Sequence, residues 1–246
     1  MPRKMNKIFP IVCIGASAGG LEAITEFLIN IPPDTGMAFI YVQHLSPDHE
    51  SILASILSRS TAMKVHQAKE LMKIEPNHFY VIPPDKEMYV LDGKLGLSPR
   101  KKDHSVNMPI DVFFTSLAEK HGPRVIGIIL SGAATDGTRG MRSIKSNGGL
   151  TFAQDDSAKF SSMPKSAIAA NVADFILSPE MIAKELVRLS HNQFAGGGKI
   201  SLTQEDLISD DDGDLKMLIS LLDQKAGVDF SHYKSTTIKR RILRRM

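Results

Sequence analysis

The chain has 246 residues, of which 42% are hydrophobic and 23% charged, and this composition is typical of a globular protein with one large domain or one domain plus an appendage. No apolar run approaches the roughly 18 residues that span a bilayer, and the start Met1-Pro2-Arg3-Lys4 leads into a strand-length segment, so we expect a cytoplasmic protein without direct membrane insertion. The single cysteine, Cys13, excludes an internal disulfide and a cysteine-cluster zinc site, and its place in an apolar run predicts a small core residue.

The net charge of +3 hides a division along the chain. Six of the 30 basic residues and none of the 27 acidic ones lie in residues 234–246, which leaves 24 basic against 27 acidic residues in 1–233. A nucleic-acid-binding domain would carry a broad basic face. The mildly acidic body therefore predicts no nucleic-acid partner.

Short apolar runs alternate with helical patterns for most of the length, which predicts an α/β fold, doubly wound, with a mostly parallel sheet. The expected strands are 11–14, 38–42, 124–130, 150–153 and 174–177. The expected helices are 20–29, 50–58, 109–120, 138–146, 165–171 and 178–189. Segments 78–82, 88–91 and 94–97 break the alternation and predict antiparallel strands, the last two joined as a hairpin by Asp92-Gly93.

A change in composition near His191 predicts the end of this domain. Gly196-Gly197-Gly198 has the backbone freedom of a linker, and leucines at helical spacing follow between Leu215 and Leu222. We therefore expect a domain at 1–192, a linker at 193–214 and a short helical C-terminal appendage at 215–246. Because the chain stops inside a basic helical pattern, we expect it to be a fragment of a longer polypeptide.

The first strand ends in a turn with the spacing Gly15-x-Ser17-x-Gly19, and a helical pattern follows at once. This is the form of a nucleophile elbow, in which small neighbours tolerate strained dihedrals and the serine hydroxyl projects over the carboxyl end of a sheet. A phosphate-binding turn and a turn needed only for packing are the alternatives. The residues fit phosphate binding poorly, because a dinucleotide fingerprint needs glycine at Ser17 and a P-loop needs Gly-Lys-Ser/Thr after the turn.

Two other strands end in residues that a serine nucleophile requires, a general base and an acid that orients it. His44 follows strand 38–42, and Asp136 lies in a glycine-bounded loop after strand 124–130. Active sites of open α/β sheets form at this edge, so we expect Ser17, His44 and Asp136 to meet there. A metal site at His44-x-x-x-Asp48-His49-Glu50 is the weaker alternative, since that spacing matches no standard site, and we expect neither a metal nor an organic cofactor. The other six histidines are most simply polar surface residues.

Five motifs in the right order over residues 8–190 resemble the catalytic domain of chemotaxis protein-glutamate methylesterases, the CheB family. They are Ile14-Gly15-Ala16-Ser17-Ala18-Gly19-Gly20, Val42-Gln43-His44-Leu45, Pro109-x-Asp111-Val112-Phe113-Phe114, Leu130-Ser131-Gly132-x-x-x-Asp136-Gly137, and Ala153-Gln154-Asp155-x-x-Ala158 with Met163-Pro164-x-x-Ala167.

The resemblance implies Ser17 as nucleophile, His44 as base and Asp136 as the orienting carboxylate. It implies that the substrates are glutamate γ-methyl esters in the helical methylation region of methyl-accepting chemotaxis receptors, with glutamine deamidation as a second activity. The oxyanion would meet backbone amides at Ala18 and Ala133. This chain departs from the family at Ala18, where threonine is usual, and at Ala133-Ala134, where a methionine is usual. A catalytically weak receptor-binding or scaffolding module on the same fold is therefore the alternative function.

The C-terminal segment has a resemblance of its own. The pattern that begins Ala226-Gly227-Val228-Asp229-Phe230-Ser231 and ends in Arg244-Arg245-Met246 is similar to the opening of chemotaxis receptor methyltransferases, the CheR family. The chain thus looks like the first part of a methylesterase–methyltransferase fusion. Only ten residues precede the first expected strand, so we expect no control through an attached receiver domain of the kind usual in the methylesterase family.

Overall fold

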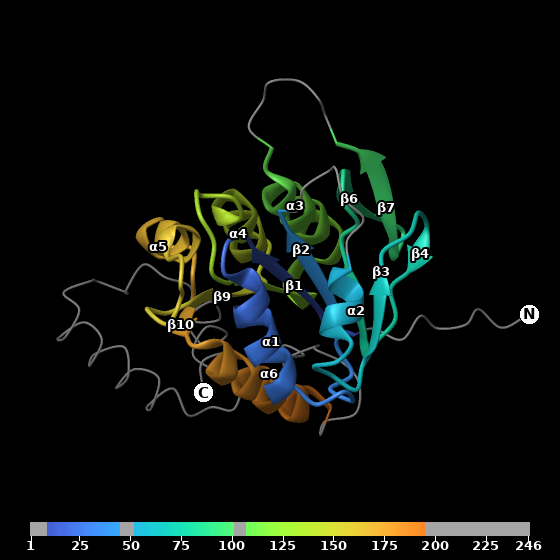
Figure 1. Ribbon diagram of the computed structural model, residues 1–246, viewed down its shortest axis with the longest axis horizontal. Helices are drawn as coiled ribbons and strands as arrows, with labels where there is room; N and C mark the ends of the chain where they lie inside the picture. Colours follow the sequence, from blue (N-terminus) through green and yellow to red (C-terminus); the bar gives the residue numbers. More distant parts are fainter. Residues whose placement is uncertain (1–8, 45–51, 101–106, 195–246) are drawn as a thin grey trace, which may run out of the picture. The chain divides into compact units, whose positions relative to one another are not determined.

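The computed structural model describes residues 9–44, 52–100 and 107–194 of the chain. Its centre is a seven-stranded sheet with the order β10-β9-β8-β1-β2-β5-β3, in which every neighbouring pair is parallel (Figure 1). The strands of this sheet are β1 (Ile11–Ala16), β2 (Ala38–Gln43), β3 (Lys64–Gln67), β5 (His78–Val81), β8 (Val125–Ile129), β9 (Leu150–Gln154) and β10 (Phe175–Leu177).

The central strands are apolar along their whole length because helices cover both faces of the sheet. All six residues of β1 and all five of β8 are buried. The helices are α1 (Gly20–Asn30), α2 (Leu53–Leu57), α3 (Pro109–His121), α4 (Thr138–Ser146), α5 (Ser162–Ala169) and α6 (Pro179–Phe194), with a short 3₁₀ turn at Gly122–Arg124. The prediction of a doubly wound, mostly parallel α/β fold is confirmed.

Alternate side chains of each strand enter two separate cores. In β1, Ile11 and Cys13 pack with residues of α3, α4 and α5, whereas Val12 and Ile14 pack with residues of α1, α2 and α6 on the opposite face. Cys13 is fully buried, as predicted for a core residue, and burial raises the pKa of its thiol well above the usual range. The chain crosses from one face to the other between β1 and its two neighbours, β2 and β8, and the carboxyl edge at that point is where open α/β sheets form sites.

A second, antiparallel sheet has the order β4-β7-β6 and consists of β4 (Met72–Lys73), β6 (Lys86–Leu91) and β7 (Lys94–Pro99). Asp92 and Gly93 connect β6 to β7 and both have positive φ, 49° and 74°, as a tight hairpin turn requires. The predicted hairpin is therefore confirmed.

The expectation that residues 78–82 form an antiparallel strand is wrong. β5 lies parallel to β2 on one side and to β3 on the other, so it belongs to the main sheet. A short apolar run shows that a strand is buried but does not fix its direction. The direction follows from residues 68–77, which include β4 and carry the chain back to the starting edge before β5 begins.

Five of the six helices differ from their predicted bounds, and the ends of helices are commonly uncertain by a residue or two. α1 and α3 end one residue later than predicted, and α2 spans Leu53–Leu57 within the predicted 50–58. α5 begins at Ser162, three residues before the predicted start, because Pro164 falls in its first turn, where a missing amide hydrogen costs nothing. α6 continues to Phe194. The predicted linker beyond residue 194 and the helical segment 215–246 lie outside the described residues, and the domain boundaries stay predictions.

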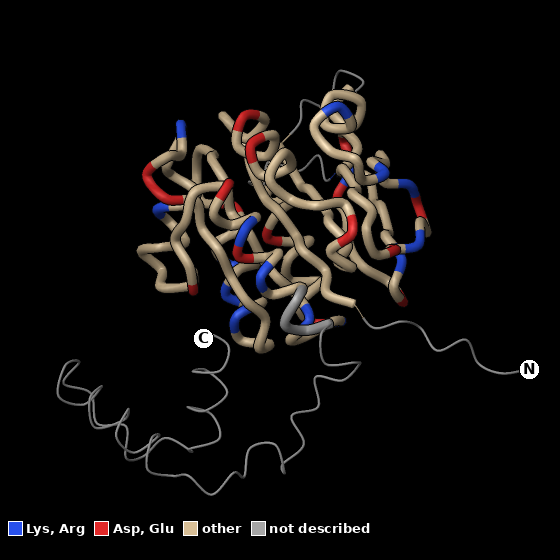
Figure 2. The backbone as a smooth tube through the Cα atoms, turned by 90° about the horizontal axis from the view of Figure 1, so that it is seen from below, with Lys and Arg blue, Asp and Glu red and all other residues tan. Residues whose placement is uncertain are grey.

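Acidic and basic residues are scattered among each other over the described backbone (Figure 2), and some of them form ion pairs. One such pair, Lys145 with Asp174, joins α4 to the segment before β10 at 3.0 Å. None of the helices in the described ranges is both long enough and apolar enough to cross a bilayer.

Candidate active site

Ser17 leaves the carboxyl end of β1 in a tight turn. The Ser17 carbonyl accepts a hydrogen bond from the Gly20 N–H at 2.9 Å, which closes the turn, and the Ser17 N–H donates to the Ser131 carbonyl at 3.0 Å. The residue with left-handed backbone is Gly19, with φ 70°, and a side chain there would come within 2.6 Å of the Ser131 hydroxyl. The strain that we expected around the serine is therefore carried by Gly19, since Ser17 does not adopt a positive φ.

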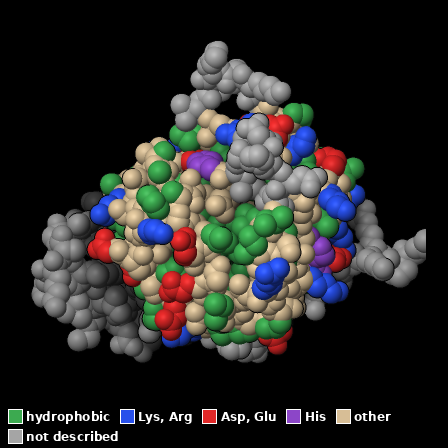
Figure 3. All heavy atoms as spheres, in the orientation of Figure 1, with side chains coloured by type: hydrophobic (Ala, Val, Ile, Leu, Met, Phe, Trp, Pro, Cys, Tyr) green, Lys and Arg blue, Asp and Glu red, His purple; other side chains and the backbone are tan. Residues whose placement is uncertain are grey.

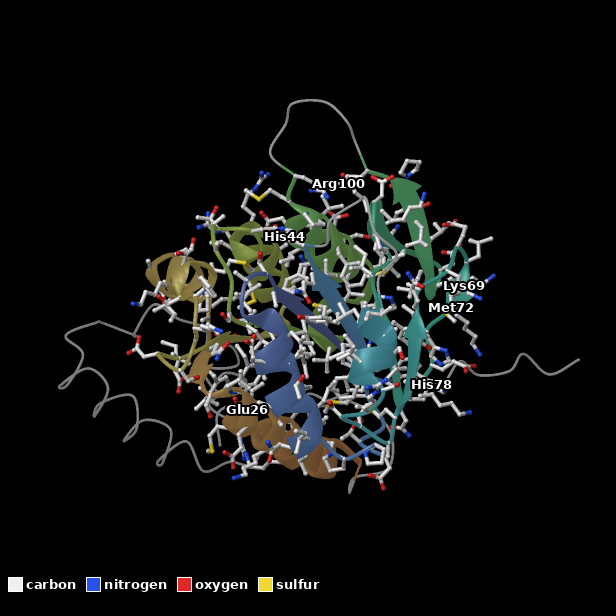
Figure 4. The ribbon with its side chains drawn as sticks, viewed as in Figure 1. Glu26, His44, Lys69, Met72, His78 and Arg100 are labelled. Carbon is white, nitrogen blue, oxygen red and sulfur yellow. The ribbon has the colours of Figure 1, made fainter. Side chains whose placement is uncertain are left out.

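His44 is placed beside Ser17 by the register of two parallel strands. Ala16 of β1 pairs with Gln43 of β2, so the next residue of each strand, Ser17 and His44, leaves the sheet at the same level. The His44 Nδ1 atom lies 3.1 Å from the Ser17 Oγ atom. A histidine side chain reaches the surface in Figure 3 at the place that Figure 4 labels His44, and about a quarter of this side chain is exposed, 26%.

Asp136 completes the hydrogen-bonded series on the other side of the imidazole. Its Oδ2 atom lies 2.8 Å from the His44 Nε2 atom, and its carboxylate is fully buried. The three residues that the sequence analysis selected are therefore in contact. With Nε2 facing a carboxylate, the ring proton of neutral His44 belongs on Nε2, and the lone pair of Nδ1 points at the Ser17 hydroxyl.

The start of α3 holds the Asp136 carboxylate. The Ile110 N–H donates to Oδ2 at 3.0 Å, and the Asp111 N–H donates to Oδ1 at 2.9 Å. These amides belong to the first turn of the helix, where N–H groups lack intrahelical partners and the helix dipole favours a negative charge. Sequence reasoning missed this contact, although Pro109 at the first helical position marks the helix start.

Asp111 is a second buried carboxylate next to Asp136, and we did not single it out from the sequence as functional. Its Oδ1 atom accepts the Gly140 N–H at 2.7 Å, which joins α3 to α4. Burial raises the pKa of Asp111, the Gly140 amide lowers it, and the nearby negative charge of Asp136 raises it again.

The two backbone amides expected to meet an oxyanion lie in segments that flank Ser17. A trans peptide directs its N–H away from its C=O. Gly20 holds the Ser17 carbonyl, and Met163 holds the Gly132 carbonyl at 3.0 Å, so the N–H groups of Ala18 and Ala133 point away from these bonds. Neither N–H donates to an acceptor within the described part of the chain. A Cβ atom added to Gly132 would lie 3.1 Å from the Ser17 Cβ atom, which brings the loop before Asp136 against the nucleophile turn.

A small cavity opens beside His44, and Figure 4 shows Arg100 at the same end of the molecule. Its lining is mixed in charge and polarity and consists of Gln43, His44, Ile82, Pro83, Asp85, Lys86, Arg100, Asn107 and Pro109. The Asn107 Oδ1 atom is buried without a hydrogen-bond partner among the residues that the structure describes. Across the nucleophile turn, Leu21 and Phe160 expose 37% and 44% of their surface. The site thus has a polar side next to His44 and an apolar rim next to Gly19.

The described residues do not support the metal site that was the weaker alternative, and they place some of the other histidines. Asp48, His49 and Glu50 lie outside them, and no group of three or more His, Cys, Asp or Glu residues within 9–44, 52–100 and 107–194 could hold a metal ion. His66 and His78 stack on each other at the edge of the sheet with ring centroids 5.3 Å apart, and His121 is half-buried at the end of α3. The prediction that the remaining histidines are surface residues is therefore too simple for His66, His78 and His121, which are all partly buried. The side chains of His104, His191 and His232 lie outside the described ones.

Comparison with known proteins identifies the family. The family model for the CheB methylesterase matches residues 12–186. The chain belongs to the CheB methylesterase family. A second family model, for the all-alpha domain of the CheR methyltransferase, matches residues 213–246. Both resemblances drawn from the sequence are thus confirmed.

Individual members of the CheB family cover the same region. A putative protein-glutamate methylesterase/protein-glutamine glutaminase from Leptospira interrogans is 34% identical over 186 residues, which are 75% of this chain and 96% of that protein. The protein-glutamate methylesterase FrzG of Myxococcus xanthus is 33% identical over 182 residues, which are 73% of this chain and 54% of FrzG. The crystal structure of the Thermotoga maritima CheB methylesterase catalytic domain superimposes with a TM-score of 0.68 at 29% identity, over 74% of this chain and 99% of that structure. These matches support a methylesterase, a hydrolase, within residues 12–186.

Proposed function

We propose that this chain is a serine hydrolase that removes methyl groups from glutamate γ-methyl esters on methyl-accepting chemotaxis receptors. The observation that carries the proposal is the hydrogen-bonded series from Ser17 through His44 to Asp136, at 3.1 and 2.8 Å, in a chain of the CheB family. A serine needs such a base to become a nucleophile, and the base needs a carboxylate to fix its tautomer and stabilise its cation.

In the proposed reaction, the Ser17 oxygen attacks the γ-carbonyl carbon while His44 Nδ1 accepts the hydroxyl proton. The resulting oxyanion accepts hydrogen bonds from the N–H groups of Ala18 and Ala133. His44 returns the proton to the leaving methoxide, so methanol departs and a glutamyl ester of Ser17 remains. Water then attacks this ester, with its proton taken by His44 and passed to Ser17, and free glutamate leaves. Deamidation of glutamine would follow the same steps with ammonia as the leaving group.

The receptor partner is proposed from the family, and the surface of the site is suited to it. A methylated glutamate on a receptor helix is flanked by apolar and polar positions of the same helix. Leu21 and Phe160 offer apolar contact on one side of Ser17, and the mixed cavity beside His44 offers polar groups on the other. The same geometry requires no metal or organic cofactor.

Ser17→Ala tests the proposal. We expect methanol release from methylated receptors to fall to the uncatalysed level while the circular dichroism spectrum is unchanged, because the variant loses only the attacking hydroxyl. Labelling by a fluorophosphonate probe, which requires an activated serine, should vanish as well. Ser55→Ala is the matched control, since Ser55 is an exposed serine of α2 whose side chain contacts neither His44 nor Ser17 in the described structure. Full methanol release by Ser17→Ala would end the proposal.

A catalytically weak receptor-binding module is the second candidate, favoured by alanine at positions 18, 133 and 134. An oxyanion site built from backbone amides survives such changes in side chain only if the loop keeps its shape. The two candidates differ in one measurement. A hydrolase is labelled by the fluorophosphonate at Ser17 and releases methanol, whereas the binding module retains receptors without either reaction.

A further inference from the structure

The buried hydroxyl of Ser131 joins two segments on either side of the nucleophile. Ser131 follows β8, and only 1% of its surface is exposed. Its Oγ atom donates a hydrogen bond to the Ala18 carbonyl at 2.8 Å and accepts one from the Phe160 N–H at 3.0 Å. One hydroxyl thus ties the turn after β1 to the loop after β9.

The backbone of Ser131 extends this connection. Its carbonyl accepts the Ser17 N–H at 3.0 Å, and its N–H donates to the Gln154 Oε1 atom at 2.8 Å. Gln154 is itself 3% exposed, and its Nε2 atom donates to the Ser157 hydroxyl at 3.1 Å. Every polar group of Ser131 therefore has a partner, and two of these partners, the Ser17 N–H and the Ala18 carbonyl, belong to the nucleophile turn.

The bond to the Ala18 carbonyl has a geometric consequence for the amides that follow Ser17. The peptide between Ala18 and Gly19 is planar and trans, so fixing its C=O toward Ser131 directs the Gly19 N–H to the opposite side. The preceding peptide is fixed independently, because the Gly20 N–H binds the Ser17 carbonyl. Ala18 therefore has both flanking peptide planes held, one of them by the Ser131 hydroxyl.

We propose that Ser131 is a positioning residue that fixes the carboxyl side of Ala18, the residue whose N–H is to receive the oxyanion. The proposal rests on the proposed hydrolase function and adds a residue that does not touch the substrate. An oxyanion site is effective because its donors are oriented before charge develops. Without the Ser131 hydroxyl, the peptide between Ala18 and Gly19 loses this hydrogen bond. Ala18 is then held only on its amino side, by the bond from the Gly20 N–H to the Ser17 carbonyl, and its N–H is less well ordered.

Ser131→Ala is the direct test, carried out on the full chain. Removal of one oxyanion donor costs a factor of about 10² to 10³ in kcat, so loosening one donor should cost less, about tenfold, with KM for the methylated receptor little changed. The affinity for an alkylboronic acid, which forms a tetrahedral adduct with Ser17, should fall by the same factor as kcat/KM. The plateau of the pH–rate profile should fall while the shape of the profile is unchanged, because the Ser131 hydroxyl bonds Ala18 and Phe160 and no titratable group of the site.

Thr151→Val is the matched control for loss of a buried hydroxyl. The Thr151 Oγ1 atom donates to the Val172 carbonyl at 2.7 Å and accepts the Asp174 N–H at 3.1 Å, so it also joins two segments, but near the start of β9. Valine keeps the volume of threonine. We expect this variant to lose thermal stability comparably to Ser131→Ala and to keep the wild-type kcat and boronic-acid affinity.

Ser131→Cys is a second variant for the case that Ser131→Ala does not fold. The thiol keeps the side-chain shape and is only a weak hydrogen-bonding group. This variant should share the loss in kcat. Wild-type kcat and boronic-acid affinity in either folded Ser131 variant, or the same loss in Thr151→Val, would overturn the proposal. Failure of the wild-type chain itself to release methanol or to react with the fluorophosphonate would instead overturn the proposed function.

Discussion

Among Ser17, His44 and Asp136, Asp136 has the most hydrogen-bond partners. Its two oxygens face three donors, namely the His44 Nε2–H and the N–H groups of Ile110 and Asp111. A carboxylate accepts all three, whereas an asparagine side chain has one oxygen and one NH₂ group. An amide at this position must therefore direct its NH₂ either at a backbone N–H or at His44.

Asp136→Asn should lower kcat for methanol release by about 10⁴, the size of the corresponding effect in serine proteases. If the NH₂ group faces Nε2, the His44 proton moves to Nδ1, and the nitrogen beside Ser17 can no longer accept a proton. Circular dichroism should show an intact fold. Asp155→Asn is the control, because Asp155 lies in the loop after β9 and makes no contact with His44. A kcat within tenfold of wild type in Asp136→Asn would contradict the assigned role.

Helices α3 and α4 are joined near the site by the Asp111 carboxylate, which does not contact His44. Asp111 lies in the first turn of α3 and accepts the Gly140 N–H of α4, and burial raises its pKa above the usual value. The folded protein therefore keeps the Asp111 proton to higher pH than the unfolded chain, whose aspartates titrate near a pKa of about 3.9. Stability contributed by this group falls as pH rises from that value through the raised pKa of the folded state.

Asp111→Asn removes this charge and keeps an oxygen that can accept the Gly140 N–H. We expect the urea midpoint of the variant, relative to wild type, to increase between pH 4 and pH 7, with little change in the m-value. Glu119→Gln, which removes an exposed carboxylate from the same helix, controls for the change in net charge. If the difference in urea midpoint between Asp111→Asn and wild type is equal at both pH values, or decreases with pH, ionisation of Asp111 does not destabilise the folded protein.

Several elements were predictable because their periodicity and end signals agree. Proline at the start of α3 marks the helix, and glycine at φ 74° marks the hairpin between β6 and β7. β3 was missed because three of its four residues, Lys64–Gln67, are polar, and none of the four is fully buried at the edge of the sheet. The direction of β5 was wrong because direction depends on the connection and not on the strand.

Some residues of the candidate site were likewise predictable from the sequence, and others were not. Ser17, His44 and Asp136 were predictable because each follows an apolar strand, and parallel strands bring their carboxyl ends together. The roles of Asp111 and Ser131 were not, because they depend on hydrogen bonds between a side chain and a backbone group that lie between 23 and 113 residues apart in the sequence. No pattern of side chains encodes such a contact.

At the scale of the whole molecule, the described site is independent of the C-terminal segment in sequence. The side chains of the site and their hydrogen-bond partners fall between residues 17 and 163. The segment 200–246 contains one leucine-rich pattern of helix length, and a lone helix of that length is marginal in water.

Deleting residues 200–246 should therefore leave the thermal midpoint nearly unchanged. The rate of fluorophosphonate labelling at Ser17 should stay within about twofold of the full chain, because a small change in the free energy of unfolding leaves nearly all molecules folded. Both proteins are compared at equal concentration of labelled serine. Unfolding of the shortened chain, or loss of Ser17 labelling, would show that the C-terminal segment is part of the hydrolase fold and that the predicted boundary at 192 is wrong.

The order of strands around β1 also determines when Ser17, His44 and Asp136 can meet during synthesis of the chain. Ser17 and His44 are translated early and come from neighbouring strands, but Asp136 waits for β8, which pairs with β1 across more than a hundred intervening residues. Such a pairing closes a long loop and forms late, since the entropy of loop closure must be overcome before the contacts stabilise it. Until β8 has paired with β1, Ser17 and His44 of a ribosome-bound chain lack the Asp136 carboxylate. On the proposed function, hydrolytic reactivity therefore begins only after β8 has paired with β1.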